Sequence, residues 1–309
     1  MKFFARVPNI DFMAQRKVGL AVSSVLTIAT ILLLIFRGLN FGIDFTGGVL
    51  VEVAYPQAVE LDDVRSHLEK GGYERAVVQY FGTTQDVLIR LPPAANANSA
   101  EVSSRILEAL DARNENIELR RIDFVGPQVG EELTEKGALA LLVAFIGIAI
   151  YIMLRFEWKF SVGAVSALIH DALMALGFLS IFWVEFDLTT LAAILALIGY
   201  SNNETIVIYD RVRENLISQR RADIFEVVNL SINQTLLRSV ITHLTTLLVL
   251  TALLLMGGAS VHSFSVALIV GVIVATYSSI YVSTGLAIVL GISREDLLPP
   301  KEEAIDESP

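Results

Sequence analysis

The sequence predicts a multi-pass α-helical membrane protein with six transmembrane helices and one α+β domain outside the bilayer. Hydrophobic residues make up 54% of the 309 residues, and charged residues make up only 18%. The apolar residues fall into six runs, each close to or above the roughly 20 residues that a helix needs to cross a bilayer. A long polar stretch between the first two runs predicts the folded domain.

The composition also excludes several classes of protein. A mean hydropathy of +0.60 is too high for a disordered chain or an ordinary soluble enzyme. The formal charge of −10 gives no basic surface for nucleic acid, so we expect no nucleic-acid partner. The absence of cysteine excludes disulfides and zinc–thiolate sites, and the four histidines form no paired ligand motif. We therefore expect no metal and no cofactor.

Six segments are predicted to span the membrane. They are Val18–Phe36, Gly137–Leu154, Ser161–Val184, Leu188–Tyr209, Arg238–Gly257 and His262–Gly291. Core helices of a soluble protein are the alternative, but six such runs would leave no polar faces to meet water. The first run is longer than the apolar part of a signal peptide and no small-x-small cleavage site follows it, so we expect an uncleaved anchor.

The positions of Lys and Arg in the short loops predict the orientation. Basic residues occur in the N-terminal segment 1–17, in the loop after the second helix and in the loop after the fourth. The short loops 185–187 and 258–261 contain none. Both termini, including the acidic tail 292–309, are therefore predicted to be cytoplasmic, and residues 37–136 are predicted to lie on the opposite side.

Residues 37–136 have the pattern of a small α+β domain. Alternating apolar and polar positions predict the first of four strands, and the other three segments also have the pattern of strands. Two further segments predict helices, one closed by Gly71-Gly72 and one with Ser99 as its N-cap. The strands are Val49–Tyr55, Arg75–Phe81, Asp86–Leu91 and Ile117–Val125, the helices are Leu61–Lys70 and Ser99–Asn114, and the turn is Gly82–Gln85. The order βαββαβ is typical of a ferredoxin-like sandwich. The domain has no catalytic constellation, so we expect it to bind a polypeptide segment or a partner domain.

Ionisable side chains inside the predicted helices are the strongest functional signal, because such groups are costly in a bilayer. They are His170, Asp171, Glu204, Arg238 and His243. A helix rise of about 1.5 Å per residue places those of the third, fourth and fifth helices at a similar depth, in the cytoplasmic half. The shared depth predicts one site.

Glu204 and Arg238 form the predicted centre of that site. Arg238 shares a helix face with Thr242, Thr245 and Thr246, and Glu204 shares one with Ser201 and Thr205. A carboxylate opposite a guanidinium would offset the cost of burying both. Protonation of the carboxylate would break the pair, which would make it a proton-driven switch. A static structural ion pair is the alternative.

The remaining polar residues each have a structural and a functional interpretation. His170 and Asp171 either lie on the proton path or form a packing hydrogen bond, and His243 is either functional or a buried imidazole with its hydrogen bonds satisfied. Asn202 and Asn203 either bond neighbouring helices or hold water on the path. Segment 222–237 is apolar enough on one face to lie along the membrane surface.

Several segments resemble the SecD/SecF family. The motifs are Phe41–Gly48, Val125–Gly130, Arg155–Phe160, His170-Asp171, Ile198–Asn215 and Asn229–Thr246. In Phe41–Gly48 the family signature falls on Gly42, Asp44, Gly47 and Gly48. We expect the three glycines to permit tight turns where the chain leaves the membrane, with direct substrate contact as the alternative.

The resemblance implies a non-enzymatic subunit of the general secretion machinery in the bacterial inner membrane. It implies half of an RND-type transporter, whose proton-linked carboxylate falls on Glu204 and whose key arginine falls on Arg238. The implied partners are SecD as the complementary six-helix half, the SecYEG channel, YajC, unfolded exported polypeptides and membrane lipid. The implied role is to use the proton gradient in late steps of translocation. Glu204 departs from the aspartate usual in the family, and Asn202 stands where an apolar residue is usual.

Three other functions are weighed against this one. An RND-type small-molecule exporter generally carries two six-helix halves and two outward domains, whereas this chain has one of each. An intramembrane enzyme would need a motif such as Gly-x-Ser-x-Gly or His-Glu-x-x-His, and the helices contain neither. The third alternative is a passive scaffold for assembly of the translocase. The sequence does not exclude it, because a static ion pair and a proton-driven switch would use the same two residues.

Overall fold

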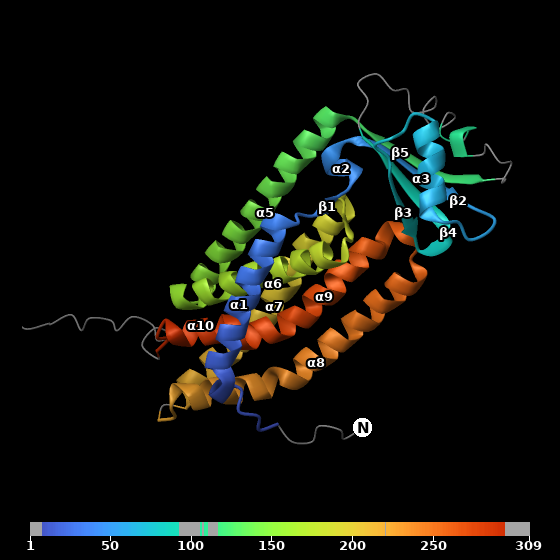
Figure 1. The fold of residues 1–309 in the computed structure, drawn as a ribbon. Helices are drawn as coiled ribbons and strands as arrows, with labels where there is room; N and C mark the ends of the chain where they lie inside the picture. The colour runs from blue at the N-terminus through green and yellow to red at the C-terminus, as the bar shows by residue number, and fades with distance from the viewer. Residues whose placement is uncertain (1–7, 93–105, 107, 111–116, 220, 294–309) are drawn as a thin grey trace, which may run out of the picture.

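The computed structural model describes residues 8–92, 106, 108–110, 117–219 and 221–293. Within them, six helices are long and apolar enough to cross a membrane, which confirms the predicted helical membrane protein. They are α1 (Arg16–Phe36), α5 (Pro127–Arg155), α6 (Trp158–Phe182), α7 (Leu188–Ser218), α8 (Ile224–Met256) and a sixth that runs from α9 (His262–Ser278) through a π-helical segment (Ser279–Ser283) into α10 (Thr284–Val289). Figure 1 shows them as a bundle with a β-sheet at one end.

Several helices extend beyond the predicted apolar runs. Helix α5 begins at Pro127 rather than Gly137, α7 continues to Ser218, and α8 begins at Ile224 rather than Arg238. Segment 222–237, predicted to lie along the membrane surface, is therefore mostly the first turns of α8. The reason is that hydropathy reports the bilayer, whereas the end of a helix is set by capping. Asp223, for example, caps α8 by accepting a hydrogen bond from the backbone N–H of Phe225 at 3.1 Å.

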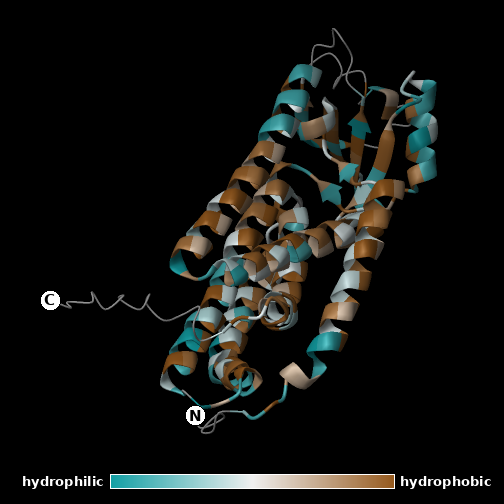
Figure 2. Ribbon diagram, turned by 90° about the vertical axis from the view of Figure 1, so that its left-hand side faces the viewer, coloured by the Kyte–Doolittle hydropathy of each residue, from teal (hydrophilic) through white to brown (hydrophobic). Residues whose placement is uncertain are grey.

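The helices differ in how much of their surface the chain itself buries. In the most apolar window of α6, of α7 and of the sixth helix, 50% of the residues are buried, against 11% in α1, 11% in α5 and 17% in α8. Figure 2 shows long hydrophobic stretches along the helices of the bundle. The chain therefore has an inner group of three helices and an outer group of three.

The domain at the end of the bundle is a four-stranded antiparallel sheet. Its strands are β2 (Gly48–Ala54), β3 (Val77–Phe81), β4 (Thr83–Leu91) and β5 (Glu118–Val125), and they lie in the order β3-β4-β2-β5. Helix α3 (Leu61–Lys70) packs Val64 and Leu68 against alternate strand residues such as Val51 and Ile89. The four strands and the first helix agree with the sequence pattern, while the helix predicted at 99–114 lies mostly outside the described residues.

The turn between β3 and β4 is shorter than predicted. Only Gly82 separates the two strands, with a φ of 82°, so Thr83–Gln85 belong to β4 rather than to a turn. The carbonyl groups of Thr84 and Gln85 accept hydrogen bonds from the backbone of Val59 and Tyr55, at 3.1 and 2.8 Å. These bonds explain why the segment is extended.

A short sheet and one arginine join the domain to the helices. Strand β1 (Asn40–Phe41) pairs in parallel with β6 (Glu185–Phe186), which lies between α6 and α7. Arg90 of β4 donates to Asn40 Oδ1 at 3.0 Å and to the Phe41 carbonyl at 2.8 Å, and its Nη2 lies 3.1 Å from Glu185 Oε1. The domain is therefore fixed to two loops of the bundle.

The residues of the predicted signature turn the chain from α1 into the sheet. Helix α2 (Ile43–Thr46) follows Gly42, and Asp44 accepts a hydrogen bond from the N–H of Leu188, the first residue of α7, at 2.9 Å. Gly47 and Gly48 have φ values of 68° and 126°, which confirms the predicted turns. Gly42 has an ordinary φ of −70°, but a Cβ there would lie 3.0 Å from Glu185 Oε1.

The segment before α1 is held by two asparagines of α8. The Asn233 side chain accepts from the Ile10 N–H at 2.9 Å and donates to the Ile10 carbonyl at 2.8 Å. The Asn229 side chain accepts from the Phe12 N–H at 2.8 Å. These bonds link the segment before α1 to the N-terminal turns of α8.

Candidate functional site

The candidate site is a layer of polar side chains between α6, α7, α8 and α9. The members are buried or half-buried: His170, Asp171, Ser201, Glu204, Ser239, His243, Thr276 and Ser278. Four of the five ionisable residues predicted from depth belong to it, and we call it the polar layer. It consists of two clusters, which are linked along α7 by Ser201 and Glu204 and along α9 by Thr276 and Ser278.

The first cluster surrounds Asp171, whose relative exposure is 1%. Its Oδ2 accepts hydrogen bonds from Ser201 at 2.6 Å and from Ser278 at 2.8 Å, and its Oδ1 lies 3.1 Å from His170 Nδ1. Because these partners come from three helices, Asp171 bonds α6 to both α7 and α9. Such contacts satisfy a carboxyl group that could not otherwise be buried.

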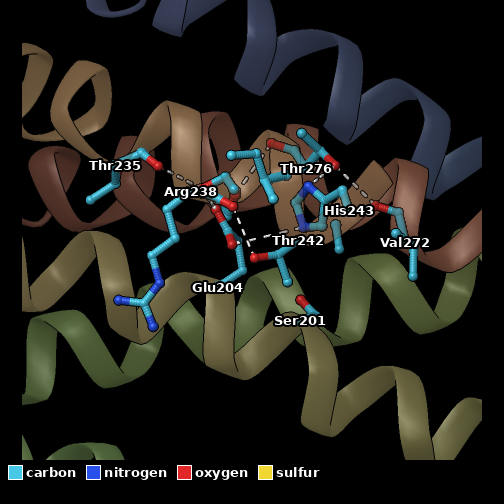
Figure 3. A network of polar contacts seen from close by, with 12 residues as sticks. Ser201, Glu204, Thr235, Arg238, Thr242, His243, Val272 and Thr276 are labelled. Atoms are coloured by element: carbon cyan, nitrogen blue, oxygen red, sulfur yellow. Dashed lines mark hydrogen bonds and ion pairs between the residues drawn. The ribbon is translucent and has the colours of Figure 1, made fainter. Parts of the chain in front are cut away.

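The second cluster surrounds Glu204, and Figure 3 shows it from close by. Ser239 of α8 donates a hydrogen bond to Glu204 Oε1, and His243 Nε2, one turn further along α8, lies 3.8 Å from Glu204 Oε2. The other ring nitrogen of His243 lies 2.8 Å from Thr276 Oγ1. A buried carboxyl group and a buried imidazole therefore face each other between three helices.

The sequence predicted that Arg238 would pair with Glu204, but the structure does not bring the two side chains together. The Arg238 side chain is exposed, makes no ion pair with any other described residue, and points away from Glu204 in Figure 3. The reason is helix geometry, since Ser239 and His243 are four residues apart and share the face that meets α7. Arg238 lies about 100° around the helix from Ser239.

The predicted polar stripe of α8 is present but faces outward. Thr242 and Thr246 are half-buried and Thr245 is exposed, and the Thr242 hydroxyl donates to the Arg238 carbonyl at 2.9 Å. Asn203 of α7 is exposed. The Asn202 Oδ1 atom is buried and has no hydrogen-bond partner among the described residues. Of the two interpretations of Asn202 and Asn203, the hydrogen bonds between helices are therefore not seen among the described residues.

Sequence reasoning missed three members of the polar layer: Ser239, Thr276 and Ser278. Serine and threonine are frequent in membrane helices, so their presence alone predicts little. A usable signal existed in the spacing of Ser239 and His243, which put two polar groups on one face. For metals, the described residues contain no cluster of three or more His, Asp or Glu side chains that could hold an ion.

Comparison with known families gives two matches. The family described as protein export membrane protein SecD/SecF, C-terminal, matches residues 105–293, and the SecD/SecF GG motif matches residues 32–59. The GG motif region contains the predicted signature, Gly42 to Gly48.

Known proteins resemble the chain over nearly its whole length. It is 47% identical to the protein translocase subunit SecF of Pseudomonas aeruginosa, over 98% of this chain and 99% of that protein. It is 42% identical to the protein of the same name from Escherichia coli O157:H7, over 95% and 91%. A crystal structure of SecDF, a translocon-associated membrane protein from Thermus thermophilus, matches with a TM-score of 0.84 and 36% identity. That match covers 92% of this chain and 39% of the solved one.

Proposed function

The chain belongs to the SecD/SecF family of protein export membrane proteins, and from this premise we propose that it is one six-helix half of a proton-driven unit in protein translocation. In this proposal the proton gradient assists late steps of export across the inner membrane. The sheet domain faces the periplasm and both termini face the cytoplasm. The chain itself hydrolyses nothing and needs no cofactor beyond protons.

The burial of Glu204 inside the helix bundle is the observation that carries this proposal. Only 7% of the residue is exposed, and a hydroxyl and an imidazole flank its carboxyl group. Ionisable residues at such positions are expensive and usually functional. A proton that crosses the full membrane potential supplies about 2.3 kcal/mol per 100 mV, which shifts a two-state equilibrium roughly fiftyfold. Protonation of Glu204 could therefore drive a change in helix packing.

The exposed position of Arg238 supports a second six-helix half as partner. A guanidinium facing lipid at membrane depth is costly, and the neighbouring Thr242 and Thr245 make the same face of α8 polar. A SecD-type half with a carboxylate on this face would remove that cost. The solved SecDF chain, of which this chain spans 39%, is consistent with such a partner. The proposal further implies contacts with the SecYEG channel, YajC and unfolded polypeptides during export.

The test is precursor export into membrane vesicles with and without a proton gradient. We expect Glu204→Gln to lose the gradient-dependent part of export, because an amide cannot take up the proton. Glu204→Asp should keep part of it, since the titratable group remains. The control is Glu214→Gln, which makes the same change on the same helix at an exposed ion pair with Arg211. If Glu204→Gln keeps gradient-dependent export, the passive scaffold is the better explanation and the family assignment stands.

A further inference from the structure

One ring nitrogen in the polar layer lacks a partner. His243 Nε2 is buried and has no hydrogen-bond partner among the described residues, and it faces Glu204 Oε2 at 3.8 Å. This distance is longer than a hydrogen bond but short enough for charges to interact strongly in a buried site. The location of the protons therefore decides whether the contact is favourable.

The contacts of Thr276 determine which nitrogen of neutral His243 carries the hydrogen. The Thr276 hydroxyl has a single hydrogen, and its oxygen lies 3.0 Å from the Val272 carbonyl and 2.8 Å from His243 Nδ1. Both contacts are hydrogen bonds at once only if Thr276 donates to Val272 and accepts from an Nδ1–H group. The neutral ring then presents the lone pair of Nε2 to Glu204.

Ser239 has a similar constraint on the other side of the carboxyl group. Its hydroxyl contacts Glu204 Oε1 and the Thr235 carbonyl, the latter at 3.2 Å. Both contacts are hydrogen bonds at once if Glu204 is protonated on Oε1 and donates to Ser239, which then donates to Thr235. When Glu204 is ionised, the Ser239 hydroxyl donates to the carboxylate instead.

We propose that Glu204 and His243 form a dyad that holds one proton between them. In one state a neutral Glu204 donates to Ser239 beside a neutral His243. In the other, a Glu204 carboxylate accepts from Ser239 and faces a His243 imidazolium. The proton leaves one residue as the other takes it up, so the charge of the pair does not change. Loss of that proton would leave a buried carboxylate against a lone pair, which is unfavourable.

The surroundings of the dyad contain few other charges. On α7 the Tyr200 ring lies 5.6 Å from the His243 ring, on α8 the Arg238 side chain points away, and on α6 His170 and Asp171 belong to the other cluster. Glu204 and His243 therefore interact chiefly with each other, across the 3.8 Å between Oε2 and Nε2. This inference deepens the proposed function by assigning His243 as a second proton-binding residue beside Glu204.

Spectroscopy of the purified full chain in lipid nanodiscs at neutral pH tests the dyad without any export assay. The infrared band of protonated Glu204 is the band that disappears in Glu204→Gln. The ¹⁵N signals of His243 are those that disappear in His243→Asn, among only four histidines. We expect either a protonated carboxyl group with an Nδ1–H imidazole, or a carboxylate with an imidazolium. A carboxylate beside a neutral imidazole, or two protonated groups, would overturn the proposal.

Thr276→Val provides the second arm, because it removes the acceptor for Nδ1–H. We expect the ratio of Nδ1–H to Nε2–H tautomer to fall about tenfold, as for the loss of one buried hydrogen bond. Thr242→Val is the matched control, since its hydroxyl donates to the Arg238 carbonyl. Equal tautomer ratios in the two variants would contradict the dyad. If the spectra agree with the dyad but Glu204→Gln exports normally, the proposed function fails and the dyad stands.

Discussion

Gly48 has a backbone conformation and surroundings that leave no room for a side chain. Its φ is 126°, and a Cβ placed there would lie 2.3 Å from the Leu91 carbonyl oxygen of the neighbouring strand. We expect Gly48→Ala to lower the free energy of unfolding by about 1–3 kcal/mol, because it adds both backbone strain and a clash. Thermal unfolding of the full chain in detergent, followed by circular dichroism, measures the loss.

The control for this prediction is Gly147→Ala in the middle of α5. A Cβ there meets nothing within 4 Å, and alanine is the better helix former. Gly147→Ala should therefore leave the unfolding temperature unchanged or raise it slightly. If Gly48→Ala and Gly147→Ala unfold at the same temperature, the predicted strain and clash of a side chain at position 48 are contradicted.

For single residues, the sequence indicates which side chains are unusual in a membrane helix, but not which of them contact one another. Glu204, His243 and Arg238 were all identified from their position in apolar helices. The choice between His243 and Arg238 as the neighbour of Glu204 depends on the rotation of α8 about its axis. That rotation is set by packing against α7 and α9, which no local pattern encodes.

At the scale of elements, we expect the contact between β4 and β6 to depend on pH, because it contains the buried carboxyl group of Glu185. Burial raises the pKa of Glu185 above its ordinary 4.5, although Arg90 lowers it; Asp187 and Asp44 raise it further. From pH 4.5 up to the raised pKa, the folded chain binds more protons at Glu185 than the unfolded chain. The contribution of Glu185 to stability is therefore largest at low pH and is lost as the pH rises through this window.

Glu185→Gln should remove this part of the pH dependence. We expect the variant to show a flatter dependence of unfolding temperature on pH from 4.5 upward, because an amide does not titrate. Thermal unfolding of the full chain in a pH series measures the slope. Glu69→Gln, an exposed residue of α3, is the control and should keep the slope of the wild type. A Glu185→Gln variant with an unaltered slope would show that another group titrates.

Elements were predicted well where the pattern is local. In β2, the buried residues Val49, Val51 and Val53 alternate with the half-buried Leu50 and Glu52, and this alternation is visible in the sequence. The ends of α5 and α8 were missed because their polar first turns are as helical as the apolar remainder. The turn at Gly82 was predicted to be too long. The backbone hydrogen bonds from Tyr55 and Val59 that keep the start of β4 extended come from another part of the chain, so a local pattern does not reveal them.

For the molecule as a whole, the exposed polar face of α8 predicts where the proposed partner binds. A photoreactive residue in place of Thr245, which is exposed on this face, should crosslink to co-expressed SecD. The same residue in place of Leu142, which is 56% exposed on apolar α5, should crosslink mainly to lipid. Gel analysis of the crosslinked products measures both. Crosslinking to SecD from position 142 and not from 245 would contradict the proposed interface.

The hydrogen bonds from Asn229 and Asn233 to the residues before α1 also constrain the order of events during biosynthesis. Asn233 follows Ile10 by 223 positions, and Asn229 follows Phe12 by 217. A ribosome that has just delivered α1 to the bilayer has not yet synthesised either asparagine. The start of the nascent chain must therefore wait, undocked, until α8 has emerged. Docking of the N-terminal segment is thus a late event in biogenesis, and it closes a long loop, since 223 positions separate Ile10 from Asn233.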